Sequence, residues 1–325
     1  MTGPPRWRGW SELPYAHGGP PVSGKIRCQP DDFQVEELLG FTPEGAGEHA
    51  FVRIRKCGAN TEWVARQLAR FAGVSVKTVG YAGLKDRQAV TTQWFSIHLP
   101  GRSDPDWAAL DEPQIEVLEC TRNRRKLRRG ALRGNRFRLR VRSLAGDAEG
   151  LAARLQRFAE SGVPNYYGPQ RFGRAYGNLE QADRLFAGRL SRVDRHLRGL
   201  YLSAARSQLF NEVLAARVAR GDWHRPLPGD RMQLDGARAS FLAEAPDETI
   251  RERAVRGDIH PSGPLWGQGD CLTAGAVAAL EQEVVEPFAA WREGLERYGM
   301  RQERRPLRVN ARHLQWEPEG EDSLL

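Results

Sequence analysis

The stretch Gly80-Tyr81-Ala82-Gly83-Leu84-Lys85-Asp86-Arg87-Gln88-Ala89-Val90-Thr91-Thr92-Gln93-Trp94-Phe95 is the centre of this sequence. Its two glycines and a tyrosine lead into a loop with one acid, Asp86, between two cations. After the two threonines, alternating side chains predict a strand. The residues expected on one face are Phe95, Ile97 and Leu99, and those on the other face are Trp94, Ser96 and His98.

The flanking cations Lys85 and Arg87 favour the ionised form of Asp86, because nearby positive charge stabilises a carboxylate. A carboxylate on a loop beside a rigid strand can act as a nucleophile or a base. The same pattern is also typical of a surface loop held by weak ion pairs. The pattern by itself leaves both interpretations open.

Composition indicates a folded protein with a polyanionic partner. The 325 residues suffice for two domains, or for one large domain with an insertion, and 40% are hydrophobic. Lys and Arg exceed Asp and Glu by 49 to 41, which gives a net charge of +8. Nucleic acid is the partner that this excess favours.

The cysteines Cys28, Cys57, Cys120 and Cys271 are scattered, which predicts neither a zinc site nor a disulfide framework. We therefore expect a reducing, cytoplasmic environment. The first 24 residues are rich in Gly and Pro and lack the apolar region of a signal peptide, and no apolar run is long enough for a transmembrane helix.

The segment Thr121–Arg142 holds eleven Lys and Arg residues and no acid. From Arg136 onward it alternates, and we expect Phe137, Leu139 and Val141 to face inward and the arginines outward. A merely solvated face would mix the two signs of charge. The unbalanced run therefore favours phosphate binding.

The remaining pattern predicts a mixed α/β protein. Helices are expected at about 60–72, 147–161, 178–221 with a cap at Ser203, and 275–299 divided at Pro287, and strands at 25–29, 33–39, 51–56 and 115–119. The aromatic, basic stretch 163–173 suits either base stacking or a packed domain junction.

No cofactor or metal motif emerges from the sequence. The stretch 45–50 formally matches Gly-x-Gly-x-x-Ala, but a strand is expected after it, so we interpret it as a turn. The seven histidines show no paired spacing, and no P-loop is present. A nuclease with paired metals and a methyltransferase are both disfavoured. These patterns indicate an enzyme that acts on nucleic acid without metal or cofactor, or a protein that only binds it.

Six motifs resemble the TruD family of tRNA pseudouridine synthases, in the family's order. They are Pro30-Asp31-Asp32-Phe33-x-Val35-x-Glu37, Gly80-Tyr81-Ala82-Gly83-Leu84-Lys85-Asp86-Arg87 with Thr91-x-Gln93, Gly134-Asn135-Arg136-Phe137, Pro164-Asn165-Tyr166-Tyr167-Gly168-x-Gln170-Arg171-Phe172-Gly173, His260-Pro261-Ser262-Gly263-Pro264-Leu265-Trp266-Gly267 and Glu303-Arg304-Arg305-x-Leu307-Arg308.

The resemblance implies a pseudouridine-synthase catalytic domain, a mixed sheet with flanking helices, interrupted by a family-specific α/β insertion domain. On this basis we expect residues 1–161 and 300–325 to form the catalytic domain and residues 162–299 the insertion. The two basic stretches would then belong to one domain.

The reaction that the resemblance implies is isomerisation of uridine to pseudouridine, most often at position 13 of tRNA. Asp86 would be the nucleophile, at C1′ of the ribose or C6 of the base, with no cofactor. Phe137 would stack on the flipped uracil, and Asn135 would help to hold the Asp86 loop.

Other residues complete the implied site. Arg27 or Phe33 would close the pocket, and Lys85 and Arg87 would bind RNA phosphate or anchor the loop. Family members usually continue beyond Trp316-Glu317 into a strand with a Leu-Pro-x-Gly-x-aromatic-Ala-Thr segment, and we expect pocket closure to depend on that segment. The alternative to an enzyme is a non-catalytic RNA-binding or tRNA-chaperone protein, which would show salt-dependent binding without product.

Overall fold

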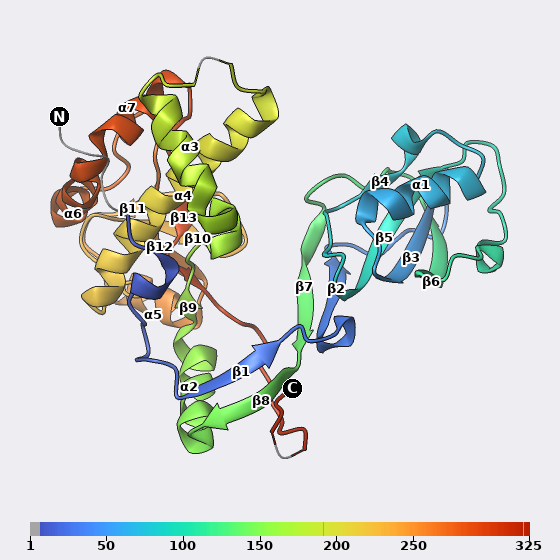
Figure 1. The fold of residues 1–325 in the computed structure, drawn as a ribbon, viewed down its shortest axis with the longest axis horizontal. Helices are drawn as coiled ribbons and strands as arrows, with labels where there is room; N and C mark the ends of the chain where they lie inside the picture. The colour runs from blue at the N-terminus through green and yellow to red at the C-terminus, as the bar shows by residue number, and fades with distance from the viewer. Residues whose placement is uncertain (1–6, 191, 321) are drawn as a thin grey trace. The chain divides into compact units, whose positions relative to one another are not determined.

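The structure, a computed structural model, describes residues 7–190, 192–320 and 322–325 and divides into two compact units (Figure 1). Among the described residues, the sheet unit comprises Pro21–Ala148 and Gln315–Leu325, and the helical unit comprises residues 7–20 and Glu149–Leu314. These bounds are set by which residues lie close to one another. The predicted division into a catalytic and an insertion domain, at residues 161 and 299, concerns function and stays a prediction. No helix among the described residues is long and apolar enough to cross a membrane.

A six-stranded mixed sheet organises the sheet unit, in the order β6-β3-β5-β2-β7 with β4 paired to β5. Its strands are β2 (Phe33–Leu39), β3 (His49–Cys57), β4 (Gly80–Tyr81), β5 (Val90–His98), β6 (Ile115–Asn123) and β7 (Leu132–Leu139). The central pair β2 and β5 is parallel, and the other pairs are antiparallel. The predicted strand 33–39 is confirmed, and the other predicted strands of this sheet lie within longer ones.

Helix α1 (Thr61–Phe71) covers part of one face of this sheet. Its buried Val64 and Leu68 pack with the alternate residues Phe95 and Ile97 of β5. The face predicted for Phe95, Ile97 and Leu99 is therefore confirmed. The opposite face is also buried, because Trp94 packs with Phe51, Ala82 and Leu127, so β5 is covered on both sides.

A two-stranded ribbon of β1 (Val22–Ile26) and β8 (Val141–Gly146) extends the sheet unit. The strand predicted at 25–29 is therefore found at 22–26, three residues earlier in the chain. The predicted inward orientation of Phe137 and Leu139 is wrong, since their side chains are 61% and 37% exposed. The chain leaves β7 at Leu139, and the ring of Phe137 stays uncovered on the sheet.

The helical unit contains the four-stranded sheet β11-β10-β12-β13, whose strand β12 contacts helices α4 and α5 (Figure 1). Its elements are α2 (Ala148–Ser161), β9 (Val163–Pro164), α3 (Gly177–Phe186), α4 (Arg195–Ala219), β10 (Asp230–Leu234), β11 (Ser240–Ala243), α5 (Glu248–Arg256), β12 (Ile259–Leu265), α6 (Gly275–Val285), α7 (Ala289–Arg297), β13 (Glu303–Pro306) and β14 (Arg308–Val309). Both units also contain short 3-10 turns. They lie at Trp10–Glu12, Pro30–Asp32, Val76–Thr78, Trp107–Ala109, Pro169–Phe172, Arg174–Tyr176 and Glu286–Phe288.

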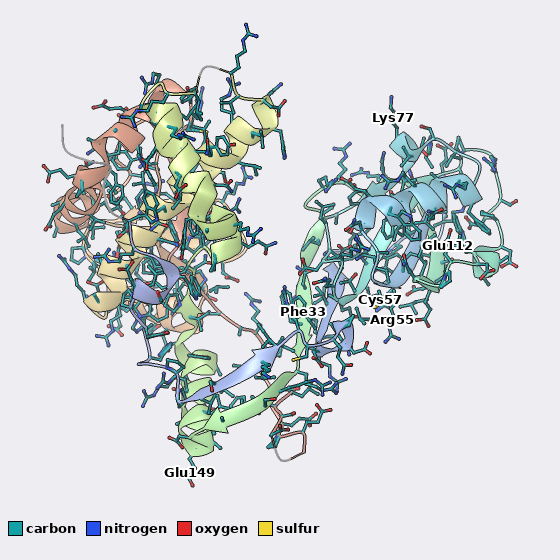
Figure 2. The ribbon with its side chains drawn as sticks, viewed as in Figure 1. Phe33, Arg55, Cys57, Lys77, Glu112 and Glu149 are labelled. Carbon is teal, nitrogen blue, oxygen red and sulfur yellow. The ribbon has the colours of Figure 1, made fainter. Side chains whose placement is uncertain are left out.

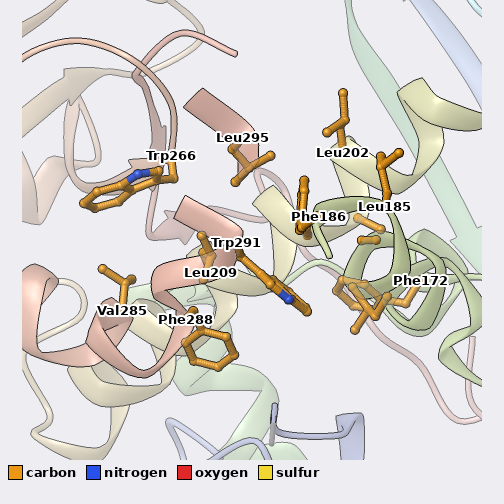
Figure 3. Packing of buried hydrophobic residues seen from close by; sticks show 14 of the residues in the cluster. Phe172, Leu185, Phe186, Leu202, Leu209, Trp266, Val285, Phe288, Trp291 and Leu295 are labelled. Carbon is orange, nitrogen blue, oxygen red and sulfur yellow. The ribbon is translucent and has the colours of Figure 1, made fainter. Parts of the chain in front are cut away.

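The core of the helical unit joins Leu209 of α4 to Phe288 and Trp291 around the start of α7 (Figure 3). The division of the last helical region at Pro287 is confirmed, because a 3-10 turn separates α6 from α7 there. The cap predicted at Ser203 is wrong. This serine lies inside α4, whose N-cap is Asp194, and the Asp194 side chain accepts a hydrogen bond from the main-chain N–H of His196.

Buried Asp32 joins the turn before β2 to the ribbon. Its carboxylate accepts a hydrogen bond from Gln29 N–H at 3.1 Å and pairs with Arg142 at 2.7 Å. The Arg142 guanidinium holds the pKa of Asp32 below its ordinary value. The stability from this contact is therefore present above the unfolded-state pKa and is lost as pH falls through the lowered folded-state pKa.

We predict that Asp32→Asn lowers the midpoint of thermal unfolding by several degrees at pH 7, because the Arg142 charge loses its buried partner. The difference from the unchanged protein should shrink in acid as Asp32 itself protonates. Melting curves between pH 7 and pH 3 test this, with the exposed neighbour Asp31→Asn as the control. An equal effect of both substitutions would contradict the assignment.

Candidate active site

Strand register brings the predicted site residues to one face of the sheet. Residues opposite each other in paired strands point to the same side. Glu37 of β2 stands opposite Asn135 of β7, and Val35 stands opposite both Phe137 and, on β5, Thr91. Thr91 in turn stands opposite Lys56 of β3, so these positions form one face, which we call the site face. Helix α1 packs over the β3 and β5 part of this face.

A buried ion pair fixes the loop that carries Asp86. Lys85 Nζ lies 2.9 Å from Glu37 Oε2, and the two side chains are 7% and 0% exposed. The Glu37 carboxylate also accepts a hydrogen bond from Trp94 N–H at 3.3 Å. The predicted anchor role of Lys85 is thus compatible with its contacts, while binding of RNA phosphate by this buried ammonium would require the pair to open.

Helix α1 holds the same loop through its first residue. The Thr61 hydroxyl accepts a hydrogen bond from Lys85 N–H at 3.0 Å and donates one to Gln93 Oε1 at 2.9 Å. Gln93 Nε2 then donates to Gly83 O at 3.3 Å. This chain of contacts links the start of α1, the centre of β5 and both sides of the loop turn, so the loop is ordered by buried side chains.

Asp86 itself is half-exposed at the surface of the site face. Its Oδ2 lies 3.4 Å from a guanidinium nitrogen of Arg27, and the two side chains are 48% and 47% exposed. Its main-chain carbonyl accepts a hydrogen bond from Lys56 Nζ at 3.0 Å. Arg87 points to the loop before α1, where its Nε donates to Gly58 O at 2.9 Å. The carboxylate is therefore held near a cation but stays accessible.

An aromatic pair lies beside Arg27. The rings of Phe33 and Phe137 stack nearly parallel, with centroids 6.1 Å apart and an interplanar angle of 12°. The Arg27 guanidinium lies 4.1 Å from the centroid of the Phe33 ring. Figure 2 marks Phe33 at the start of β2. Arg27 adopts a left-handed backbone conformation, φ 56°, which costs a non-glycine residue energy and is typical of functional positions. Arg27 thus connects the acid to the aromatic pair.

Asn135 lies on the site face with a buried Oδ1 that has no hydrogen-bond partner among the described residues. A buried acceptor without a donor is unfavourable.

The contacts described above bring Arg27, Phe33, Phe137, Lys85 and Asp86 into one connected group. Support of the Asp86 loop by Asn135 stays a prediction.

Sequence reasoning missed the side chains that hold the loop: Glu37, Lys56, Thr61 and Gln93. For Lys56, the sequence did contain a pattern that could have identified it. Alternate residues Val52 and Ile54 of β3 are apolar and buried, and the same alternation puts Lys56 on their face. Glu37 follows the same parity as Phe33 and Val35, but its partner Lys85 comes from a loop whose path no spacing predicts.

The basic segment 121–142 is partly neutralised by acids distant in sequence. Its acid-paired arginines and their partners are Arg122 with Asp104, Arg124 with Glu44, Arg136 with Glu36, Arg140 with Glu319, and Arg142 with Asp32. The cations of the segment that have no acid partner among the described residues are Arg125, Lys126, Arg128, Arg129, Arg133 and Arg138. The prediction that this segment binds phosphate therefore rests on the cations that have no acid partner.

In the described part of the chain, no group of three or more His, Cys, Asp or Glu side chains is arranged to hold a metal ion. The expectation that the reaction needs no cofactor stays a prediction.

The family model of tRNA pseudouridine synthase D (TruD) matches residues 12–180 and 176–325. The chain belongs to the TruD family. It is 52% identical over 316 residues to tRNA pseudouridine synthase D of Methylococcus capsulatus, covering 97% of this chain and 89% of the relative. The Nitrosococcus oceani tRNA pseudouridine synthase D is 50% identical over 313 residues, covering 95% and 87% of the two chains.

A crystal structure of a Methanosarcina mazei protein assigned to tRNA pseudouridine synthase D (TruD) has the same fold. Its TM-score is 0.75 at 20% identity, covering 95% of this chain and 91% of that one. The mixed α/β fold class is confirmed. As a TruD family member, the chain is a pseudouridine synthase, an isomerase.

We predict that Glu37→Gln lowers the free energy of unfolding by about 3–5 kcal/mol, because it leaves the Lys85 charge buried without its partner. The double variant Glu37→Gln with Lys85→Met should lose less than Glu37→Gln alone. Urea unfolding measures both. The matched control is Glu116→Gln, which removes an exposed pair with Arg55 and should cost no more than about 1 kcal/mol. Additive losses in the double variant would contradict this account.

Proposed function

We propose that the protein isomerises uridine to pseudouridine in tRNA, at position 13, with Asp86 as the nucleophile. The observation that carries this proposal is the grouping of an accessible carboxylate, the Arg27 guanidinium and the stacked rings of Phe33 and Phe137 on the site face. The names of the relatives and of the family supply the tRNA substrate.

In this reaction the N1–C1′ bond breaks, the uracil turns, a C5–C1′ bond forms, the C5 proton leaves and N1 takes up a proton, so that substrate and product are isomers. A nucleophile that adds to C1′ displaces the uracil, which is then held only by non-covalent contacts while it turns, whereas a nucleophile that adds to C6 stays bonded to the base. Asp86 fits either route, because its carboxylate is half-exposed while its loop is fixed. The Arg27 guanidinium lies 3.4 Å from the carboxylate that must attack.

The uracil must leave the RNA stack before it can reach Asp86. An extruded base is stabilised by an aromatic face. Phe137 offers such a face, since its ring is 61% exposed and is supported from behind by Phe33. The unpartnered Oδ1 of Asn135 supplies an acceptor for an N–H group of the base.

The basic segment supports binding of the tRNA backbone. Its cations without a described acid partner, among them Arg133 and Arg138 on β7, can each contact phosphate, whereas the acid-paired arginines stabilise the fold. We propose that residues 1–161 with 300–325 act as the catalytic domain, that 162–299 form the insertion, and that the protein works in the cytoplasm, where tRNA is its substrate.

We predict that Asp86→Asn lowers kcat by more than about 10³-fold while tRNA affinity changes little, because the amide keeps the shape of the side chain but cannot attack. Pseudouridine formation in an unmodified tRNA transcript, mapped by chemical probing, measures the first effect and filter binding the second. The exposed Asp111→Asn is the control.

Turnover by Asp86→Asn at the unchanged rate would remove Asp86 from the chemistry. Tight, salt-sensitive binding by the unchanged protein with no product on any tRNA would instead favour the non-catalytic RNA-binding alternative.

For Phe137→Ala we expect kcat/KM to fall about 10–100-fold, from loss of roughly 1–3 kcal/mol of base stacking. Unfolding should change little, because the ring is largely exposed. Phe137→Tyr keeps an aromatic face and should retain most activity. Equal losses in the two variants would show that an aromatic face is not what the site requires.

A further inference from the structure

Lys56 is a buried lysine in the core beneath the Asp86 loop. It lies at the end of β3, next to Cys57, which Figure 2 labels. The residue is 1% exposed and follows the buried Val52 and Ile54 on the same face of the strand. An apolar side chain would continue this pattern, and it would avoid the cost of taking an ammonium group out of water. Packing therefore does not explain the charge.

The contacts of the ammonium group are specific. Lys56 Nζ donates to Ala59 O at 2.8 Å and to Asp86 O at 3.0 Å. Ala59 lies two residues before α1, and Asp86 lies in the loop that precedes β5. One side chain thus ties the segment before the helix to the main chain of the acid. Hydrogen bonds to a charged donor are about twice as strong as neutral ones.

Other contacts hold the residues next to Asp86, not Asp86 itself. Lys85 is held through Glu37 and Thr61, and Arg87 through Gly58. Among the described residues, Asp86 itself makes an exposed contact with Arg27 and a buried contact with Lys56. The exposed contact is the one that a bound nucleotide would meet. The buried contact is therefore the one that sets the main-chain position of the acid during the reaction.

We propose that Lys56 is a positioning residue for the isomerase reaction, which fixes the main chain of Asp86 so that its carboxylate meets the reacting nucleotide. This inference rests on the proposed role of Asp86 as nucleophile. A displacement of about 1 Å in a reacting group can cost on the order of 10²-fold in rate. The effect should appear in kcat and not in RNA binding, since Lys56 is out of reach of a ligand.

The surroundings of Lys56 make its charge sensitive to pH. Burial lowers the pKa of Lys56 to about 8, although Asp86 and Cys57 raise it, and Lys85 lowers it further. The residues opposite it in β5 and β6, Thr91 and Ile115, carry no charge. As pH rises through about 8, the ammonium group loses its charge and the two hydrogen bonds weaken. The folded protein itself is not destabilised, because the neutral amine is easier to bury.

The experiment compares Lys56→Met with the unchanged protein and with Lys77→Met, an exposed lysine of the same unit labelled in Figure 2. We expect kcat of Lys56→Met to fall about 10–100-fold, with KM for tRNA and the thermal midpoint unchanged. The unchanged protein should lose turnover above pH about 8, and this loss should be absent in Lys56→Met. Lys77→Met should match the unchanged protein throughout.

A second variant keeps the test decisive if Lys56→Met folds poorly. Lys56→Gln retains N–H donors without charge, so it should keep more activity than Lys56→Met and also lack the alkaline loss. Unchanged kcat in a folded Lys56→Met would overturn the inference, as would an alkaline loss that persists in either folded variant. If Asp86→Asn is inactive while Lys56→Met is fully active, the positioning role fails and the proposed function stands. If Asp86→Asn is active, Asp86 is not the nucleophile, so the proposed function fails together with the inference that rests on it.

Discussion

The buried ion pair between Lys85 and Glu37 is the contact on which the site depends. Two charges removed from water stabilise the structure only when each meets the other and further hydrogen bonds. Here the carboxylate also accepts from Trp94 N–H, and the lysine main chain is held by Thr61. The pair joins a loop to a central strand. It holds Lys85, the residue before Asp86, and so fixes one side of the loop from which the Asp86 carboxylate reaches the surface.

The same division between buried support and exposed chemistry holds across the site face. Lys56, Glu37 and Thr61 are buried and contact the loop, whereas Asp86, Arg27 and Phe137 are open to solvent. Lys56, Glu37 and Phe137 lie on strands whose register puts them on one face, and Asp86 and Arg27 lie on segments next to those strands. A reacting carboxylate needs such support, since loops without it sample many conformations.

Charge in the basic segment follows a related logic. Read along the sequence, 121–142 is a run of cations without any acid. In three dimensions Asp32, Glu36 and Glu319 come back to its strands from distant positions. These pairs limit self-repulsion within the sheet unit, and the remaining cations keep the net positive charge that a polyanion requires. The net charge of the sequence predicted a polyanionic partner, but it did not show which cations are free to bind that partner.

The sequence by itself determined the local elements and the family. Strand 33–39, the helix after Asn60 and the break at Pro287 follow from short-range periodicity and proline geometry, which act within a few residues. The six motifs sufficed for the TruD family. Only the tertiary structure decided that Phe137 is exposed, that Arg27 reaches Asp86 and that Lys56 lies beneath it. These contacts depend on strand order and on loop paths between residues that are 30 or more positions apart, and no local pattern contains that information.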